Sequence, residues 1–139
     1  MKKLTILLSL SLLLAACDLG FPKMTVNYDN LPHGKIKEYI TKTFPNEPEK
    51  EALSKMIYAQ LSGDKSADNI RKTVSQMGMT CEVEKEMCEY LGYIKTKVAG
   101  ISSGSGRAKR IYHIVIFPKK GMDSLKIEYQ IVEDTEKVN

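Results

Sequence analysis

Residues 111–131 read IYHIVIFPKKGMDSLKIEYQI, and two patterns in this stretch decide the fold. Residues 111–117 are apolar apart from His113, which is typical of a central strand covered on both faces. Residues 125–131 alternate between apolar and polar side chains, which indicates a strand with one buried face. Because only a short turn beginning with PKKG at 118–121 separates them, the two strands are expected to pair antiparallel.

The stretch before this pair adds a third strand. Between residues 88 and 98, apolar or small side chains alternate with Glu89, Lys95 and Lys97, which predicts a strand with one solvated face. Residues 100–106 read GISSGSG and predict a flexible loop. Three consecutive strands with short connections predict an antiparallel meander.

Upstream of Gly78 the apolar residues recur with a period near 3.6, which indicates helices. We expect a short helix ended by Pro45, a second with its N-cap at Asn46 and Gly63 at its end, and a third capped by Ser66. The side chains expected to face the core from these helices are Ile36, Tyr39, Ile40, Leu53, Met56, Ile57, Leu61, Ile70, Val74 and Met77.

These elements predict the α+β class, with two to three N-terminal helices packed on one face of a three-stranded antiparallel meander sheet. Residues 35–132 are expected to form this single domain, followed by a charged tail at 133–139. Residues 17–34 contain prolines and glycines without periodicity, so we expect a tether there.

The N-terminus has the parts of a secretory signal. Residues 1–16 begin with MKK, continue through an apolar run and end in two alanines. That run is shorter than the roughly 20 residues of a membrane-spanning helix.

Residues 14–17 (LAAC) resemble the lipobox of bacterial lipoproteins, which implies cleavage before Cys17 and attachment of diacylglycerol and a further acyl chain such as palmitate to Cys17. Several chains anchor a protein stably, whereas one binds only marginally. Asp18 resembles the inner-membrane retention signal of enteric lipoproteins, and the choice between inner and outer membrane stays open.

With Cys17 lipidated, Cys81 and Cys88 remain in a compartment that permits disulfides. Their spacing fits neither a redox motif nor a zinc knuckle, so we expect a bridge across a hairpin. Closing this loop is worth about 2.5 kcal/mol on the loop-entropy relation.

Charge excludes one class of partner and suggests another. Removing Lys2 and Lys3 from the 21 basic residues leaves 19 against 17 acidic ones, which is not the composition of a nucleic-acid-binding protein. Residues 95–132, however, hold eight basic and two acidic side chains. This excess predicts contact with an anionic lipid surface or an acidic envelope protein, although lysines that only keep a face soluble are the alternative. The best contact candidates are Lys95, Lys97, Lys109 and Arg110.

The order of a lipidated cysteine, a tether, helices joined at residues 61–66 and three strands resembles the BamE/SmpA-like small lipoproteins. The resemblance extends over residues 50–132. Two departures are the absence of a proline after Gly78 and the added Cys81–Cys88 hairpin. The resemblance implies that the protein is a non-enzymatic accessory of envelope assembly or integrity. The positions that carry it are Gly63, Ser66, Ile70, Val74, Met77 and Gly78.

No residue set in the chain predicts catalysis, a metal or another cofactor. Residues 100–104 spell Gly-x-Ser-x-Gly around Ser102, but a nucleophile elbow needs a strand-to-helix turn in a much larger sheet. His33 and His113 are the only histidines, and metal sites need three or four convergent ligands. The methionines fall largely on core positions.

The sequence therefore predicts a lipid-anchored, periplasm-facing interaction or accessory protein of the bacterial cell envelope, and not an enzyme. The alternative is an inhibitor or exclusion-type lipoprotein that blocks a foreign enzyme, a phage or a conjugating cell. The αα-βββ unit supports both, because the β-lactamase inhibitor protein uses the same unit to bind an enzyme with its sheet.

Overall fold

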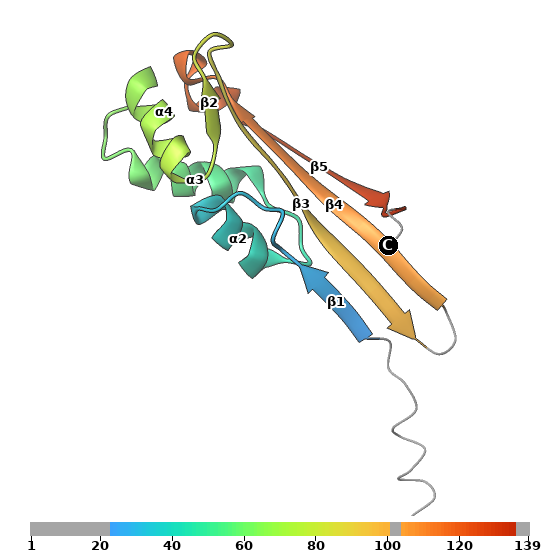
Figure 1. Cartoon of the computed structure of the whole chain (residues 1–139). Coiled ribbons are helices and arrows are strands. Elements are labelled where there is room, and N and C mark those ends of the chain that lie inside the picture. Colours follow the sequence, from blue (N-terminus) through green and yellow to red (C-terminus); the bar gives the residue numbers. More distant parts are fainter. Residues whose placement is uncertain (1–22, 101–103, 136–139) are drawn as a thin grey trace, which may run out of the picture.

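The computed structural model describes residues 23–100 and 104–135 (Figure 1). The predicted signal at 1–16, Cys17, Asp18, Ser102 and the end of the predicted tail lie outside the described residues. The elements in chain order are β1 Lys23–Asn27, α2 Lys35–Thr43, α3 Lys50–Gln60, α4 Ala67–Gln76, β2 Thr80–Glu82, β3 Met87–Gly100, β4 Gly104–Ile116, the 3-10 turns η2 Pro118–Lys120 and η3 Met122–Ser124, and β5 Lys126–Glu133.

The fold is α+β, with three helices followed by most of a five-stranded antiparallel sheet. The predicted meander is formed by β3, β4 and β5, but the prediction of only three strands is wrong. The order is β1-β3-β4-β5, and β2 pairs with the start of β3 while β1 pairs with its end. The two short strands satisfy backbone groups along an edge of β3 that would otherwise stay unpaired.

Part of the predicted tether belongs to the folded domain. Leu31 is only 2% exposed, the Tyr93 amide donates a hydrogen bond to the Asn30 carbonyl at 3.3 Å, and the Tyr90 hydroxyl donates to the Pro32 carbonyl at 3.2 Å. The folded domain therefore includes β1 and the residues that follow it, which precede the predicted start at residue 35. Residues 17–22 of the predicted tether lie outside the described residues.

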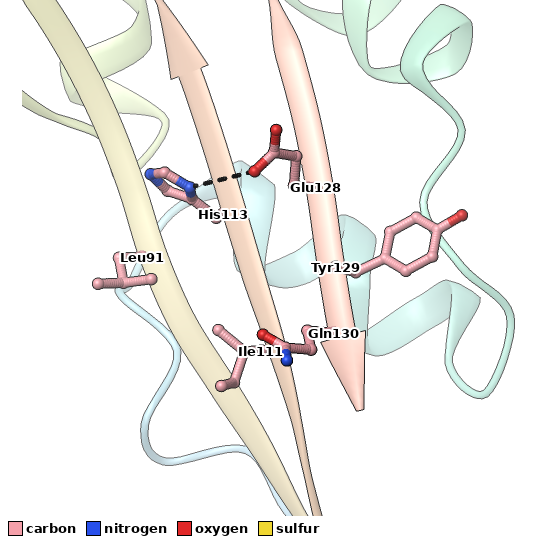
Figure 2. A pocket seen from close by; sticks show the side chains of 6 residues that line it. All are labelled: Leu91, Ile111, His113, Glu128, Tyr129 and Gln130. Atoms are coloured by element: carbon pink, nitrogen blue, oxygen red, sulfur yellow. Dashed lines mark ion pairs between the residues drawn. The ribbon is translucent and has the colours of Figure 1, made fainter. Parts of the chain in front are cut away.

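The helices cover one face of the sheet, and β4 is not buried on both faces as its apolar sequence predicted. Tyr112, Ile114 and Ile116 are buried and join the helices in one core, whereas Ile111 and His113, which alternate with them along β4, are half-buried on the opposite face (Figure 2). Three helices on one side leave the second face open, so its apolar residues pack only against strand neighbours.

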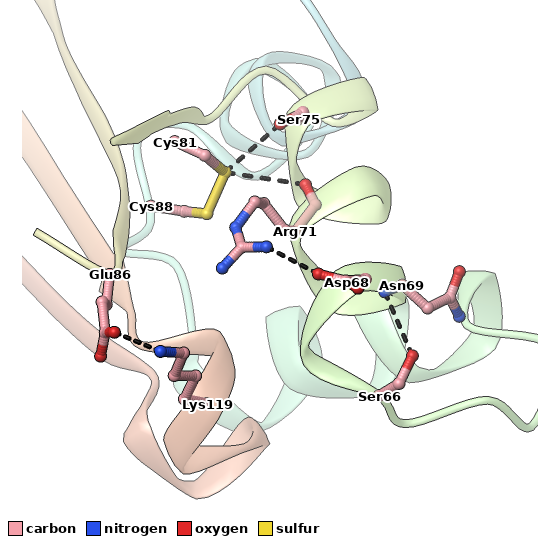
Figure 3. A network of polar contacts seen from close by, with 9 residues as sticks. All are labelled: Ser66, Asp68, Asn69, Arg71, Ser75, Cys81, Glu86, Cys88 and Lys119. Atoms are coloured by element: carbon pink, nitrogen blue, oxygen red, sulfur yellow. Dashed lines mark hydrogen bonds and ion pairs between the residues drawn. A yellow bond between two sulfur atoms is a disulfide. The ribbon is translucent and has the colours of Figure 1, made fainter. Parts of the chain in front are cut away.

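The helix boundaries follow local rules. The side chain of Ser66 caps α4 by accepting a hydrogen bond from the Asn69 amide at 3.3 Å, as predicted (Figure 3). Gly78 follows α4 with a φ of 108°, which favours glycine. The predicted cap at Asn46 is wrong, because Pro48 disfavours helical geometry at Glu47, where the helix would have begun. The N-cap is Glu49, and α3 begins at Lys50.

The expected bridge between Cys81 and Cys88 is present. The two residues face each other across β2 and β3, with an S–S distance of 2.03 Å (Figure 3). Because a disulfide sulfur carries no hydrogen, the Ser75 hydroxyl, 3.3 Å from Cys81 Sγ, is the donor. A Glu86–Lys119 ion pair joins the turn of this hairpin to η2. The bridge thus closes the hairpin, and the Ser75 hydrogen bond ties the hairpin to α4.

Reduction of the bridge should lower the free energy of unfolding by about 2.5 kcal/mol, because an eight-residue loop is released in the unfolded chain. Urea unfolding of mature chain carrying Cys17→Ser, with and without reductant, measures the difference. In the Cys81→Ala/Cys88→Ala variant reductant should have no effect. An unfolding midpoint of the mature chain that does not move on reduction would contradict the bridge.

Gly92 of β3 is the point where residues 30–32 lie closest to the sheet. A Cβ atom added at Gly92 would lie 2.7 Å from Pro32 Cδ and 3.0 Å from the Asn30 carbonyl oxygen. Gly92→Ala should therefore destabilise the domain by about 1–3 kcal/mol, as overpacking does in well-packed cores. Gly106→Ala on β4, where a Cβ would meet nothing within 4 Å, is the matched control and should be neutral or slightly stabilising. Equal thermal unfolding midpoints for the two variants would show that the contact is unimportant.

Candidate functional site

The candidate site is the sheet face that the helices leave uncovered, which we call the open face (Figure 1). Directly paired residues of antiparallel strands place their side chains on the same face, so the register defines its members. They are Glu89, Leu91, Tyr93, Lys95 and Lys97 of β3, Arg107, Lys109, Ile111, His113 and Val115 of β4, and Lys126, Glu128, Gln130 and Val132 of β5.

A shallow hollow of about 490 Å³ lies in the middle of the open face (Figure 2). Leu91 forms one wall and is 57% exposed, and Ile111 lies beside it. Tyr129 points away from the other side chains in Figure 2, since it pairs with Tyr112 on the helix side, so the hollow extends around the edge strand β5. An exposed leucine beside half-buried apolar neighbours is an apolar centre within a polar surface.

His113 bridges two carboxylates across the three strands. Its Nε2 lies 2.6 Å from Glu89 Oε1 on β3, and its Nδ1 lies 3.8 Å from Glu128 Oε2 on β5. Each carboxylate faces a different ring nitrogen, so the three groups do not converge on one point. Within the described ranges, no group of three or more His, Cys, Asp or Glu residues is arranged to hold a metal ion. The arrangement orients the imidazole and forms a polar rim beside Leu91.

Three of the four predicted contact residues lie on the open face. Lys95, Lys97 and Lys109 gather at the end of the sheet next to β1. Arg110 does not join them, because successive side chains of a strand point to opposite faces. It lies on the helix side, 5.3 Å from the centre of the Phe44 ring, and its guanidinium donates to the Pro45 carbonyl.

Sequence reasoning missed two residues of this basic group. Arg107 is directly opposite Lys97, and Lys23 is opposite Ala99 on the same face. The alternation of side chains along β4 could have selected Arg107 in place of Arg110. No local pattern marks Lys23, because the strand that carries it has only five residues.

The remaining sequence candidates stay apart from the hollow. His33 is exposed in the segment before α2. The Gly-x-Ser-x-Gly motif spans the connection from β3 to β4, and therefore joins two strands rather than a strand and a helix. A nucleophile elbow, in contrast, lies between a strand and a helix.

Tyr129 gives the β5 edge of the hollow a hydroxyl group that stays neutral. The Tyr129 hydroxyl donates to the Glu47 carboxylate, and this hydrogen bond raises the pKa of Tyr129. Burial likewise raises the pKa of Tyr112 in the core beneath it. Because its single hydroxyl proton is donated to Glu47, the Tyr129 hydroxyl offers the hollow an accepting oxygen.

Comparisons with protein-family models, with curated proteins and with solved structures found no match for this chain. Over residues 23–100 and 104–135, no helix has the length and apolar character needed to cross a bilayer.

Proposed function

We propose that this chain is a lipid-anchored, periplasm-facing accessory protein of the bacterial cell envelope that binds another envelope protein with its open face. The role is non-enzymatic and serves envelope assembly or integrity. The lipobox-like residues ending at Cys17 support the anchor, and the open face supports the binding.

The observation that carries the proposal is the position of Leu91. Its side chain is 57% exposed on β3, and a polar rim beside it consists of Glu89 on the same strand, His113 on β4 and Glu128 on β5. Protein interfaces have this anatomy, with an apolar centre that becomes desolvated inside a polar rim. The Glu128 side chain is 74% exposed, so the surface suits a protein that offers an apolar side chain to Leu91 and a basic group to Glu128.

The proposed lipid anchor allows this small surface to bind its partner despite a modest affinity. A hollow of about 490 Å³ suits a modest contact rather than a large permanent interface. Restriction to the membrane raises the effective concentration of the open face near partners in the same membrane, which compensates for modest affinity.

A photo-activated cross-linking residue in place of Leu91 should form adducts with resident envelope proteins in growing cells. The same residue in place of Val83, which is 73% exposed in the turn between β2 and β3, is the matched control and should not give those adducts. Leu91→Asp should weaken binding of the purified partner by about tenfold or more, and Val83→Asp should not. Identical adducts from both positions would contradict the proposal, and adducts that form only with an incoming phage, plasmid or foreign enzyme would establish the inhibitor or exclusion role instead.

Cys17→Ala should abolish incorporation of labelled palmitate and move the protein from the membrane fraction to the soluble fraction, because the acceptor thiol is lost. Asp18→Asn changes the neighbouring side chain, keeps the thiol and should remain labelled. Palmitate incorporation into Cys17→Ala would contradict the anchor.

A further inference from the structure

The sheet end that carries Lys23, Lys95, Lys97, Arg107 and Lys109 on the open face, here called the basic end, concentrates positive charge. Lys95 lies directly opposite Lys109, and Lys97 lies directly opposite Arg107. Lys23 adds a third strand to the group through its pairing with Ala99. Among the described residues, the Asp134 carboxylate lies 3.4 Å from the Lys109 ammonium group.

The Lys95–Lys109 and Lys97–Arg107 pairs are unfavourable unless other interactions offset the repulsion between their charges. Like charges directly opposite on neighbouring strands repel each other, because their Cβ atoms are only about 5 Å apart. The Tyr93 ring accepts Lys95 and Lys109 at 5.8 Å and 5.4 Å from its centre, and Asp134 pairs with Lys109. These contacts offset the repulsion from within the domain, and a surface of negative charge lying against the strands would offset it from outside.

The chain enters the domain at this end. β1 starts at Lys23 beside the end of β3, and Cys17 is six residues earlier in the sequence. Six residues span at most about 20 Å. A lipid on Cys17 therefore holds the basic end close to the headgroups, where anionic phospholipids attract lysine and arginine side chains over about one Debye length.

We propose that the basic end binds the anionic phospholipid headgroups of the membrane that carries the protein. Contact through Lys97 and Arg107 orients the domain with its long strands rising from the membrane. This inference rests on the proposed function in one respect, since the anchor at Cys17 brings the basic end to the bilayer.

Vesicles made of equal parts phosphatidylserine and phosphatidylcholine test the contact without the anchor. The probe protein is mature chain, residues 17–139, with Cys17→Ser, which contains every described helix and strand. It should sediment with these vesicles, should not sediment with pure phosphatidylcholine, and should dissociate as salt is raised. Lys97→Gln/Arg107→Gln should weaken binding by about tenfold or more, because each cation near the surface contributes to the attraction.

The matched control is Lys119→Gln/Lys120→Gln, which removes the same charge from η2 at the opposite end of β4. This control should bind like the parent, and so should Leu91→Asp, which separates the membrane contact from the proposed protein contact. The thermal unfolding midpoint of each variant is measured beside its vesicle binding, so that a loss of binding is distinguished from a loss of folding. The proposal would be overturned if both charge variants weakened binding equally, or if the mature chain did not bind anionic vesicles. It would also be overturned if Lys97 cross-linked to a protein in cells while the purified chain failed to bind vesicles. None of these outcomes affects the palmitate test of the anchor.

Discussion

Residues 30–34 pass between β3 and the C-terminal end of α4, and this close approach holds the two layers of the domain together. The Ile36 amide donates a hydrogen bond to the Met77 carbonyl at 3.2 Å just after the segment. A Cβ atom at Gly34 would lie 2.4 Å from the Met77 carbonyl oxygen, and one at Gly78 would lie 2.6 Å from that of His33. Both glycines also have positive φ, so side chains are disfavoured there by backbone conformation as well as by space.

The rest of the arrangement follows from this contact. With the segment held against β3, β1 pairs with the end of β3, and α2 begins beside the end of α4. All three helices then lie on one face of a sheet whose central strand has 14 residues, and the other face stays open. The charge of the open face changes along its strands. His113 and two glutamates lie beside Leu91, and the positively charged side chains lie near β1.

Local signals predicted the elements better than they predicted their environment. Ser66, Gly78 and the Cys81–Cys88 pair act through neighbours in the sequence, so their roles could be recognised from it. β1 could not, because five residues are too few to show a period, and its pairing depends on the distant strand β3. The prediction for residues 111–117 failed for a different reason. Apolar side chains on both faces of a strand indicate burial of both faces only where a second layer of structure covers the sheet, and the period of the sequence does not reveal whether that layer exists. For the candidate site, sequence reasoning found Lys95, Lys97 and Lys109 but not the exposed Leu91, whose importance arises only when β4 and β5 place His113 and Glu128 around it.

The proposed anchor and the proposed membrane contact together limit where a partner can be reached. Leu91 is six residues from Lys97 along β3, a distance of about 20 Å in an extended strand. If the basic end lies on the headgroups and the strands rise from them, the apolar centre stands about that far above the membrane surface. A partner buried in the bilayer would not meet Leu91 at that height. The geometry favours a membrane protein whose folded part extends into the periplasm, or a periplasmic protein held beside it, because either can bring an apolar side chain and a basic group to the middle of the open face.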